Sequence, residues 1–258
     1  MRIAVTTSRD EEMTESRAQR IARELDVPWI PRRGRSLDSI RAEHMLDYLL
    51  VVEREQVVLK GATILNWHPS MAVPRIKALR EGKKDPMVEA MALREGNSVL
   101  DCTLGLGSDA LVAAYAAGDG GSVTGLEASK YLAFITRWGL RHFGGQNKHL
   151  RKATDRLKVI NVDFREFLKQ QAAGSFDVVY FDPMFRHGRK KSSSINALRP
   201  LAKHDPLNEE DIREALRVAK CRVVVKESAK SGEFARLKAH FVSGGRYSPV
   251  AYGVWEKS

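Results

Sequence analysis

The chain has 258 residues, of which 43% are hydrophobic and 29% charged, and its formal net charge is +11. This composition is typical of a globular protein. The sequence holds no apolar run of membrane-spanning length and no signal-peptide core, so we expect a cytoplasmic protein. Two cysteines, Cys102 and Cys221, are too few for a disulfide framework. The positive charge favours a polyanionic partner, most simply nucleic acid, although a basic surface that only keeps the protein in solution gives the same number.

Residues 1–84 are predicted to form a small N-terminal α/β extension. Apolar residues recur there at strand or helix spacing in several places. The expected elements are a strand at Ile3–Thr7, a helix over 14–25, a hairpin of 51–52 with 57–59, and a short helix from Val73 to Arg80 with Pro74 in its first turn.

Strands and helices alternate from Asp85 onward, where Asp85 and Pro86 are typical of a helix start. That helix is expected to continue to about Arg94. The expected strands span 98–102, 122–126, 157–161, 176–181 and 222–226, and the helices span 108–117, 129–143, 164–172 and 208–219. Segments 237–242 and 250–255 are expected to add a terminal antiparallel hairpin. The fold class is therefore α/β, with a mostly parallel seven-stranded sheet and right-handed crossovers in residues 85–258.

Acidic residues lie at or just past the carboxyl ends of four predicted strands, namely Asp101, Glu127, Asp163 and Asp182. One such acid alone is more often a helix cap or a turn residue. Four in register favour a ligand site, because open α/β sheets bind ligands at the carboxyl ends of their strands. Glu127 is placed to accept hydrogen bonds from ribose hydroxyls, Asp163 with Phe164 to contact an adenine, and Asp101 to attract an ammonium group.

A glycine turn follows the first of these strands. Gly105 and Gly107 allow the backbone to approach a ligand without a side chain in the way. The segment from Gly105 to Ala110 also matches the G-x-G-x-x-A dinucleotide fingerprint, with Glu127 at about the expected distance of 20 residues. An NAD-dependent oxidoreductase is therefore an alternative. It leaves the sequence Asp182-Pro-Met-Phe185 unexplained.

The sequence Asp182-Pro-Met-Phe185 has the residue types needed to hold an amino-bearing base. The exocyclic amine of a base is a weak nucleophile, so a transfer site must accept hydrogen bonds from its N–H groups and orient it. Asp182 supplies an acceptor, Pro183 stiffens the turn, and Phe185 can stack on the base. The alternative interpretation is an ordinary Asp-Pro turn at a strand end.

A basic stretch begins directly after this motif. The residues expected to contact RNA phosphates are Arg186, Arg189, Lys190 and Lys191. A solvated loop is the usual explanation for such a run. Lys226, at the end of another strand, is also expected to bind RNA, with its side chain facing the substrate pocket. Lys226 can equally extend along the sheet edge to solvent.

These motifs resemble the ribosomal RNA small subunit methyltransferase J family, which methylates N2 of a guanine in 16S rRNA. The resemblance lies in Asp101-Cys-Thr-Leu-Gly-Leu-Gly-Ser-Asp-Ala110, in Val178-Val-Tyr-Phe-Asp-Pro-Met-Phe185 and in Arg222-Val-Val-Val-Lys226, and it covers roughly residues 85–230. It implies a Rossmann-like class I fold and S-adenosylmethionine (SAM) as cofactor. The site implied by the resemblance is lined by Asp101, Glu127, Asp163 and Asp182. Thr103, which is distinctive of the family, is also expected to bind the cofactor.

We therefore expect a SAM-dependent methyltransferase that binds RNA and takes part in rRNA processing. The first expectation for its target is guanine N2 of small-subunit rRNA, as free RNA or in a ribosomal particle. Direct methyl transfer needs neither a metal nor a covalent intermediate. The alternatives are an adenine-N6 or other amino-methyltransferase of DNA or RNA, an NAD-dependent oxidoreductase, and an RNA-binding module without catalysis.

Overall fold

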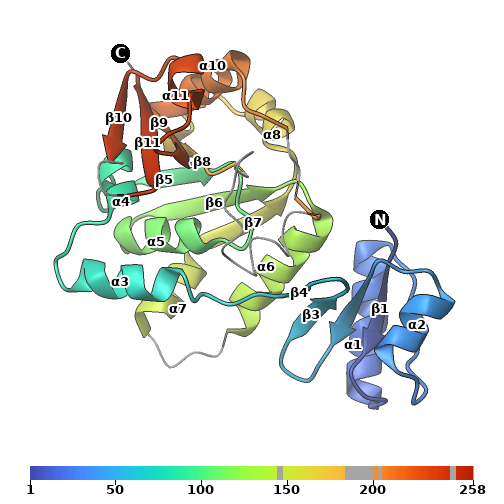
Figure 1. Cartoon of the computed structure of the whole chain (residues 1–258). Helices are drawn as coiled ribbons and strands as arrows, with labels where there is room; N and C mark the ends of the chain where they lie inside the picture. The colour runs from blue at the N-terminus through green and yellow to red at the C-terminus, as the bar shows by residue number, and fades with distance from the viewer. Residues whose placement is uncertain (144–147, 184–199, 203–204, 245–247, 258) are drawn as a thin grey trace. The chain divides into compact units, whose positions relative to one another are not determined.

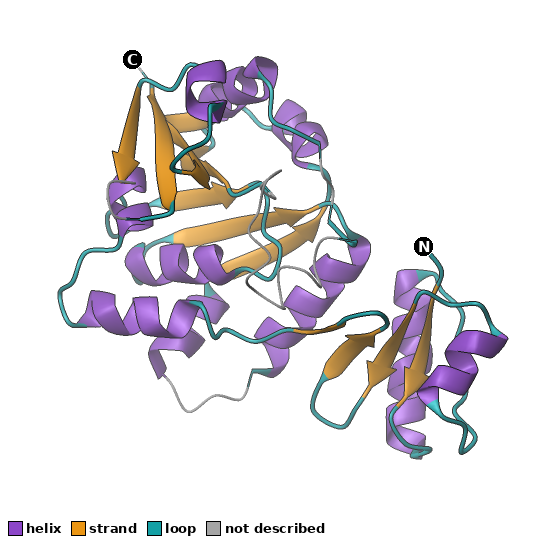
Figure 2. Ribbon diagram, in the orientation of Figure 1, coloured by secondary structure: helices purple, strands orange, loops and turns teal. Residues whose placement is uncertain are grey.

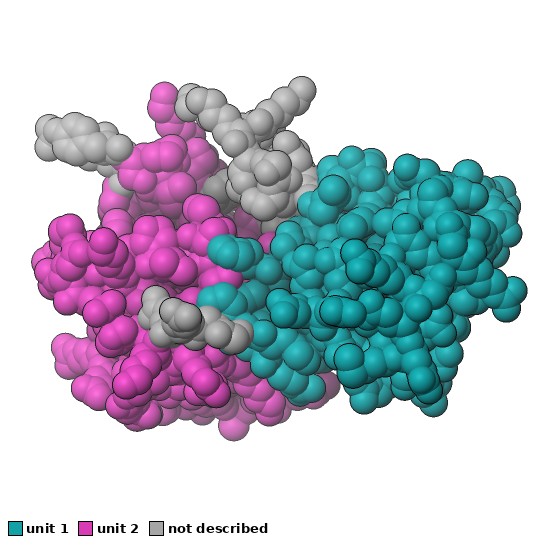
Figure 3. Space-filling model, turned by 90° about the horizontal axis from the view of Figure 1, so that it is seen from below, with its two compact units in different colours: residues 1–68, 130–143, 190–201 teal, residues 69–129, 144–189, 202–258 magenta. Residues whose placement is uncertain are grey.

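The computed structural model describes residues 1–257 except 144–147, 184–199, 203–204 and 245–247. The chain divides into two compact units, coloured separately in Figure 3. Unit 1 comprises residues 1–68, 130–143 and 190–201, and unit 2 comprises residues 69–129, 144–189 and 202–258. The division into domains 1–84 and 85–258 stays a prediction.

Unit 1 contains a four-stranded sheet in the order β1-β2-β3-β4, in which β1 and β2 run parallel and the other neighbours antiparallel. Its strands are β1 (Ile3–Thr7), β2 (Tyr48–Val52), β3 (Val57–Lys60) and β4 (Ile64–Asn66), and its helices are α1 (Glu12–Leu25), α2 (Leu37–Glu43) and α6 (Lys130–His142). The predicted first strand, first helix and hairpin are confirmed. The sequence analysis missed α2, which has only one buried residue, Ile40, and therefore no readable period. It also missed the three-residue β4.

Helix α6 belongs to unit 1 although it follows a strand of the other sheet in the sequence. Lys130 Nζ donates a hydrogen bond of 2.6 Å to the carbonyl oxygen of Leu25, and Arg137 forms an ion pair of 2.7 Å with Glu24. These pairs lie 105 and 113 positions apart in the chain. The helix was therefore predictable from local spacing, but its partners were not.

Unit 2 contains a seven-stranded sheet in the order β10-β11-β9-β8-β5-β6-β7, visible in Figures 1 and 2. Its strands are β5 (Ser98–Asp101), β6 (Ser122–Glu127), β7 (Leu157–Asn161), β8 (Phe176–Phe181), β9 (Ala219–Ser228), β10 (Phe241–Gly244) and β11 (Val250–Glu256). The ladders of β5, β6, β7, β8 and β9 are parallel, and β11 pairs antiparallel with both β9 and β10. The predicted mostly parallel sheet with a C-terminal antiparallel hairpin is confirmed.

The predicted bounds of the terminal hairpin need one correction. We expected its first strand over 237–242, whereas β10 begins at Phe241. A short helix, α11 (Glu233–Arg236), precedes it, and Leu237 is the residue that ends this helix. Leu237 is buried in the core, and its carbonyl oxygen accepts a hydrogen bond of 3.0 Å from the Trp255 indole. The apolar character of Leu237 is therefore explained by its place at a helix end in the core, and not by a strand.

The other helices of unit 2 are α3 (Ala72–Arg80), α4 (Pro86–Met91), α5 (Ser108–Ala116), α7 (Lys148–Asp155), α8 (Phe164–Gln170) and α10 (Glu209–Val218). Asp85 caps α4 as predicted, since its Oδ1 accepts from the amides of Met87 and Val88. This helix ends at Met91 rather than near Arg94, because Ala92 adopts a left-handed φ of 45°. The sequence analysis missed α7. In the described part of the chain, no helix is both long and apolar enough to cross a membrane.

The two faces of the large sheet carry different helices. Val179 and Phe181 of β8 lie in one core cluster with residues of α8 and α10. Tyr180, between them, points to the other face, because successive residues of a strand alternate in direction, and its hydroxyl contacts Asp109 of α5. Helices α3, α5 and α7 pack on one another there (Figure 1).

Candidate active site

The turn between β5 and α5 has a backbone that requires glycine. Gly105 and Gly107 have φ of +54° and +76°, in the left-handed region that other residues rarely adopt. A Cβ atom at Gly105 would meet no atom of the described residues within 4 Å, so these residues leave space beside the turn. The Gly105 amide donates a hydrogen bond of 3.0 Å to Glu127 Oε2 at the end of β6. The turn is thus fixed to the next strand.

Glu127 is 7% exposed at the end of β6. Its Oε2 accepts from Gly105, and its Oε1 accepts a hydrogen bond of 2.8 Å from the amide of Ser129. Burial raises the pKa of Glu127 above its ordinary value, against the lowering effect of the backbone amides. Each carboxylate oxygen can accept more than one hydrogen bond, so both keep capacity for a ligand hydroxyl.

Asp101 is the most deeply buried of the four predicted acids, with 2% exposure. Its Oδ1 accepts a hydrogen bond of 3.0 Å from the Thr103 amide. Burial raises the pKa of Asp101 to about 8; the Thr103 amide opposes this shift, and the carboxylates of Asp109 and Asp182 add to it. The carboxyl group is therefore mainly neutral at pH 7. A cation bound beside it would favour the ionised form, so cation binding and proton release are coupled here.

Asp163 lies after β7 and caps α8, where its Oδ1 accepts a hydrogen bond of 2.8 Å from the Arg165 amide. Phe164 meets Phe181 edge to face with a centroid distance of 5.2 Å, and the Arg165 guanidinium lies 4.8 Å from the Phe164 ring. The structural alternative for Asp163, a helix cap, is thus realised. Its predicted contact with adenine stays a prediction.

Asp182 follows β8, and its side chain is 30% exposed. Its amide donates a hydrogen bond of 2.6 Å to Thr103 Oγ1, which ties it to the turn after β5. Burial raises the pKa of Asp182 to about 6; the ammonium of Lys226 opposes this shift and the Asp109 carboxylate adds to it. Pro183 follows and is half-buried. The predicted residues Phe185, Arg186, Arg189, Lys190 and Lys191 lie outside the described residues.

Lys226, predicted to contact RNA, is level with Asp182 because β8 and β9 pair in parallel with Phe181 opposite Val225. Its Nζ lies 2.7 Å from Asp182 Oδ2 and 2.8 Å from Asp109 Oδ2, and its side chain is 19% exposed. The structure thus places Lys226 at the predicted catalytic acid. Its contact with RNA stays a prediction.

Further charged residues, which the sequence analysis did not select, continue from this point. Asp109, in the first turn of α5, accepts a hydrogen bond of 2.7 Å from the Tyr180 hydroxyl and forms an ion pair with Arg75 of α3. Arg75 also binds both carboxylate oxygens of Asp85, at 2.7 and 2.8 Å. An acidic residue in a first helical turn is common, so the sequence held no signal that Asp109 belongs to a site.

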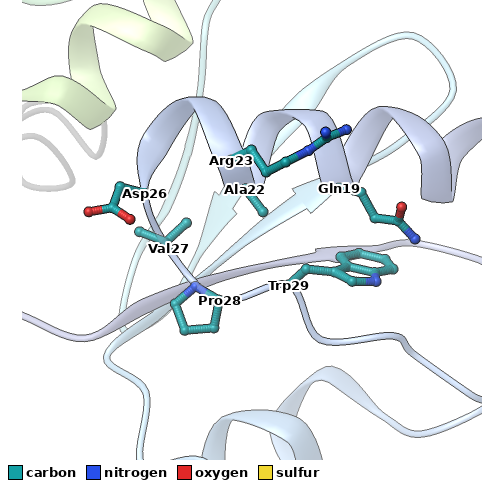
Figure 4. A pocket seen from close by; sticks show the side chains of 7 residues that line it. All are labelled: Gln19, Ala22, Arg23, Asp26, Val27, Pro28 and Trp29. Atoms are coloured by element: carbon teal, nitrogen blue, oxygen red, sulfur yellow. The ribbon is translucent and has the colours of Figure 1, made fainter.

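The described part of unit 1 contains a pocket that is separate from the predicted site residues (Figure 4). It lies between the C-terminal half of α1 and the segment that follows it. Its lining residues are Gln19, Ala22, Arg23, Asp26, Val27, Pro28 and Trp29. None of these is a predicted site residue.

The strand order and the strand-end acids define the class of protein. A parallel sheet with a glycine turn after β5, and with Asp101, Glu127 and Asp182 at adjoining strand ends, is a Rossmann-like methyltransferase fold. The solved structure of a SAM-dependent methyltransferase from Neisseria gonorrhoeae has this fold. The two superpose with a TM-score of 0.64 over 98% of this chain and 95% of the other, at 19% identity.

The family follows from the sequence comparison. A family described as "Putative SAM-dependent methyltransferase" matches residues 39–248, and the chain belongs to it. Its cofactor is therefore SAM. The uncharacterized protein YpiP of Bacillus subtilis is 39% identical over 235 residues, which are 90% of this chain and 91% of that protein.

The predicted resemblance to ribosomal RNA small subunit methyltransferase J is also confirmed. The enzyme of Hydrogenovibrio crunogenus is 33% identical over 56% of this chain, and that of Thioalkalivibrio sulfidiphilus is 30% identical over 63%. The chain spans 53% and 65% of the lengths of these two relatives. The similarity therefore covers only part of each protein.

Proposed function

We propose that this protein transfers a methyl group from SAM to an exocyclic amine of an RNA base, with guanine N2 of small-subunit rRNA as the first target. One observation carries the proposal. Asp182, which precedes Pro183, has a partly exposed carboxylate, and its backbone amide donates a hydrogen bond to Thr103 in the turn that follows β5. An acceptor for an amine thus stands beside the strand ends where ligands of this fold class bind.

The residues at these strand ends fit SAM. Glu127 offers acceptors to ribose hydroxyls. Because Gly105 has no side chain, the ligand can approach the backbone of the turn closely. The buried carboxyl of Asp101 can ionise against the ligand ammonium. The remaining residues assigned to the cofactor are Thr103, Gly107, Asp163 and Phe164. When bound, SAM supplies a methyl group on a positively charged sulfur.

The chain's own residues prepare the amine. The carboxylate of Asp182 accepts a hydrogen bond from the amine, and Pro183 holds the carbonyl of Asp182 in a stiff turn as a second acceptor. These bonds turn the nitrogen lone pair away from the acceptors and toward the methyl group, which is a gain in orientation. Phe185 is assigned to stack on the base. The proton leaves to water after the transfer.

RNA is the proposed partner because of charge as well as relatives. Residues 1–68 carry eleven Lys and Arg and eleven Asp and Glu, so the net charge of +11 lies entirely in residues 69–258. The site is in the same part of the chain. Two similar proteins are named as rRNA small subunit methyltransferases. The phosphate contacts are assigned to Arg186, Arg189, Lys190 and Lys191.

The deciding experiment is mass spectrometry of rRNA nucleosides from a deletion strain, complemented with wild type or Asp182→Ala. We expect loss of N2-methylguanosine from 16S rRNA, restored only by wild type. Loss of N6-methyladenosine would favour the adenine alternative, and DNA substrates test the DNA alternative. An unchanged nucleoside profile, together with SAM binding, would favour an RNA-binding module without catalysis.

A further inference from the structure

Lys226 occupies an unusual position for a lysine at a strand end. Its ammonium lies between two carboxylates, 2.8 Å from Asp109 Oδ2 and 2.7 Å from Asp182 Oδ2. Only 19% of its side chain is exposed. A lysine that serves as a phosphate contact keeps its ammonium in solvent, whereas this ammonium is directed to the proposed catalytic acid.

Asp109, the second carboxylate that contacts Lys226, is held in place by further contacts. Asp109 receives the Tyr180 hydroxyl at 2.7 Å and the guanidinium of Arg75, and Arg75 is held by both oxygens of Asp85. Each of these residues comes from a different element: α3, the start of α4, α5 and β8. Such a network fixes one carboxylate oxygen of Asp109 as an anchor, and Lys226 bridges from this anchor to Asp182.

We propose that Lys226 is a positioning residue for methyl transfer: anchored by Asp109, it binds Oδ2 of Asp182, keeps this carboxylate ionised and directs Oδ1 toward the amine of the target base. This role is more specific than the RNA contact predicted for Lys226 from its place at a strand end. The proposal rests on the proposed function for its chemistry, and on the geometry alone for the link between Lys226 and Asp182.

The electrostatics around Asp182 make this link necessary. A carboxyl group accepts a hydrogen bond from an amine well only when it is ionised. Burial and the nearby Asp109 carboxylate disfavour that state, since both raise the pKa of Asp182. The opposing cation is Lys226, whose own pKa is raised by both carboxylates despite burial. Arg75, Asp85, Tyr180 and the cross-strand neighbour Tyr252 complete the charged and titratable groups of the described residues that face this network.

Two substitutions test the proposal because they shift the pKa of Asp182 in opposite directions. Lys226→Met removes the stabilising cation, so the pKa of Asp182 should rise by one unit or more. Asp109→Asn removes a like charge, so that pKa should fall. General damage to the fold would change both variants alike. Lys226→Arg keeps the charge and should stay close to wild type. Lys220→Met is the matched control, since Lys220 is an exposed lysine of the same strand, paired with Asp177.

The pKa is measured first without any substrate, by carbon-13 NMR titration of the full chain labelled at aspartate carboxyl carbons, with Asp182→Asn to assign the signal. The pH profile of kcat on rRNA from the deletion strain, which lacks the methyl group, then follows for each variant. We expect the acid limb to move with the NMR value. At pH 7, kcat of Lys226→Met should fall about twofold for a one-unit rise in the pKa of Asp182 and about tenfold for a two-unit rise, and it should recover in part toward pH 9.

Three outcomes decide between the possibilities. An unchanged Asp182 titration in both Lys226→Met and Asp109→Asn would overturn the proposal. So would a Lys226→Met enzyme with normal kcat at every pH and a raised, salt-dependent KM for RNA, which is the result expected of a phosphate contact. If the NMR shifts occur as expected but wild type methylates no RNA or DNA, the link between Lys226 and Asp182 stands and the proposed function fails.

Discussion

The hydroxyl oxygen of Thr103 accepts a hydrogen bond of 2.6 Å from the backbone amide of Asp182, and the amide of Thr103 donates one of 3.0 Å to Asp101. A single residue in the turn after β5 therefore connects two acids that lie 81 positions apart, on neighbouring strands. Thr103 was predicted as a cofactor residue. In the structure it also sets the distance between the proposed cofactor side and the proposed base side of the site.

Thr103→Val tests this connection, because valine has nearly the same shape and lacks the acceptor. We expect the unfolding free energy to fall by about 1 kcal/mol, the usual net value of one hydrogen bond. We expect kcat to fall more than SAM affinity, since Asp182 loses its fixed position. Thr103→Ser keeps the oxygen and should restore both. A loss in the Ser variant together with normal values in the Val variant would show that the methyl group, and not the hydrogen bond, matters.

Asp182→Ala should abolish methyl transfer and leave SAM binding within a few fold of wild type. The proposed hydrogen bond to the amine is made mainly in the transition state, so it contributes to kcat rather than to cofactor affinity. Single-turnover kinetics with saturating SAM, beside calorimetry of SAM binding, separate the two effects. Near-normal turnover would remove Asp182 from the mechanism.

Glu127→Gln should weaken SAM binding by about 1–3 kcal/mol, the range for hydrogen bonds that involve a charged group. The amide nitrogen of glutamine cannot accept from a backbone N–H, so the contact with either Gly105 or Ser129 is also lost and some stability with it. Calorimetry gives the affinity and thermal unfolding the stability of the same sample. Normal SAM affinity in the folded fraction would assign Glu127 a structural role only.

The buried carboxyl of Asp101 predicts a specific pH dependence of stability. Burial raises its pKa from the ordinary 3.8 to about 8. Between these values the folded state binds more protons than the unfolded state, so this group's contribution to the unfolding free energy decreases as pH rises, by at most about 1.4 kcal/mol per pH unit. Asp101→Asn cannot ionise, so its melting temperature relative to wild type should increase from pH 5 to pH 9. A constant difference over that range would contradict the raised pKa.

Neutralising Arg189, Lys190 and Lys191 together should lower RNA affinity and its salt dependence, by up to about one unit of slope per lost phosphate contact. The competing candidate is the basic turn Arg32-Arg-Gly-Arg35. In this turn Arg32 donates to the carbonyl oxygen of Arg35, and Arg35 pairs with Glu43 at 2.7 Å, so these side chains are already engaged within unit 1. RNA binding across a salt series is the measurement. Superimposable curves for the triple variant and wild type would move the RNA surface to that turn.

Local sequence patterns were sufficient for most of the large sheet. Strands β5, β6, β7 and β8 are short apolar runs bounded by turn residues, and each is followed by a helix, so only a parallel sheet with crossovers accommodates them. The acids at their ends follow directly from that topology, because parallel strands end at one edge. The glycines of the turn after β5 were recognisable from their spacing, and their positive φ values give the physical reason that other residues rarely fit there.

The chemistry of the site was decided by tertiary structure. Lys226 meets Asp182 only because β8 and β9 pair in one register, and Asp109 meets both only because α5 packs over the face to which Tyr180 points. The sequence by itself determined the fold class, the cofactor family and which strand ends carry acids, since these depend on neighbours along the chain. Which acids have shifted pKa values, and which of them Lys226 contacts, depend on distances between residues 44 to 117 positions apart. No local pattern encodes such distances, because burial and register fix them only once the sheet has formed.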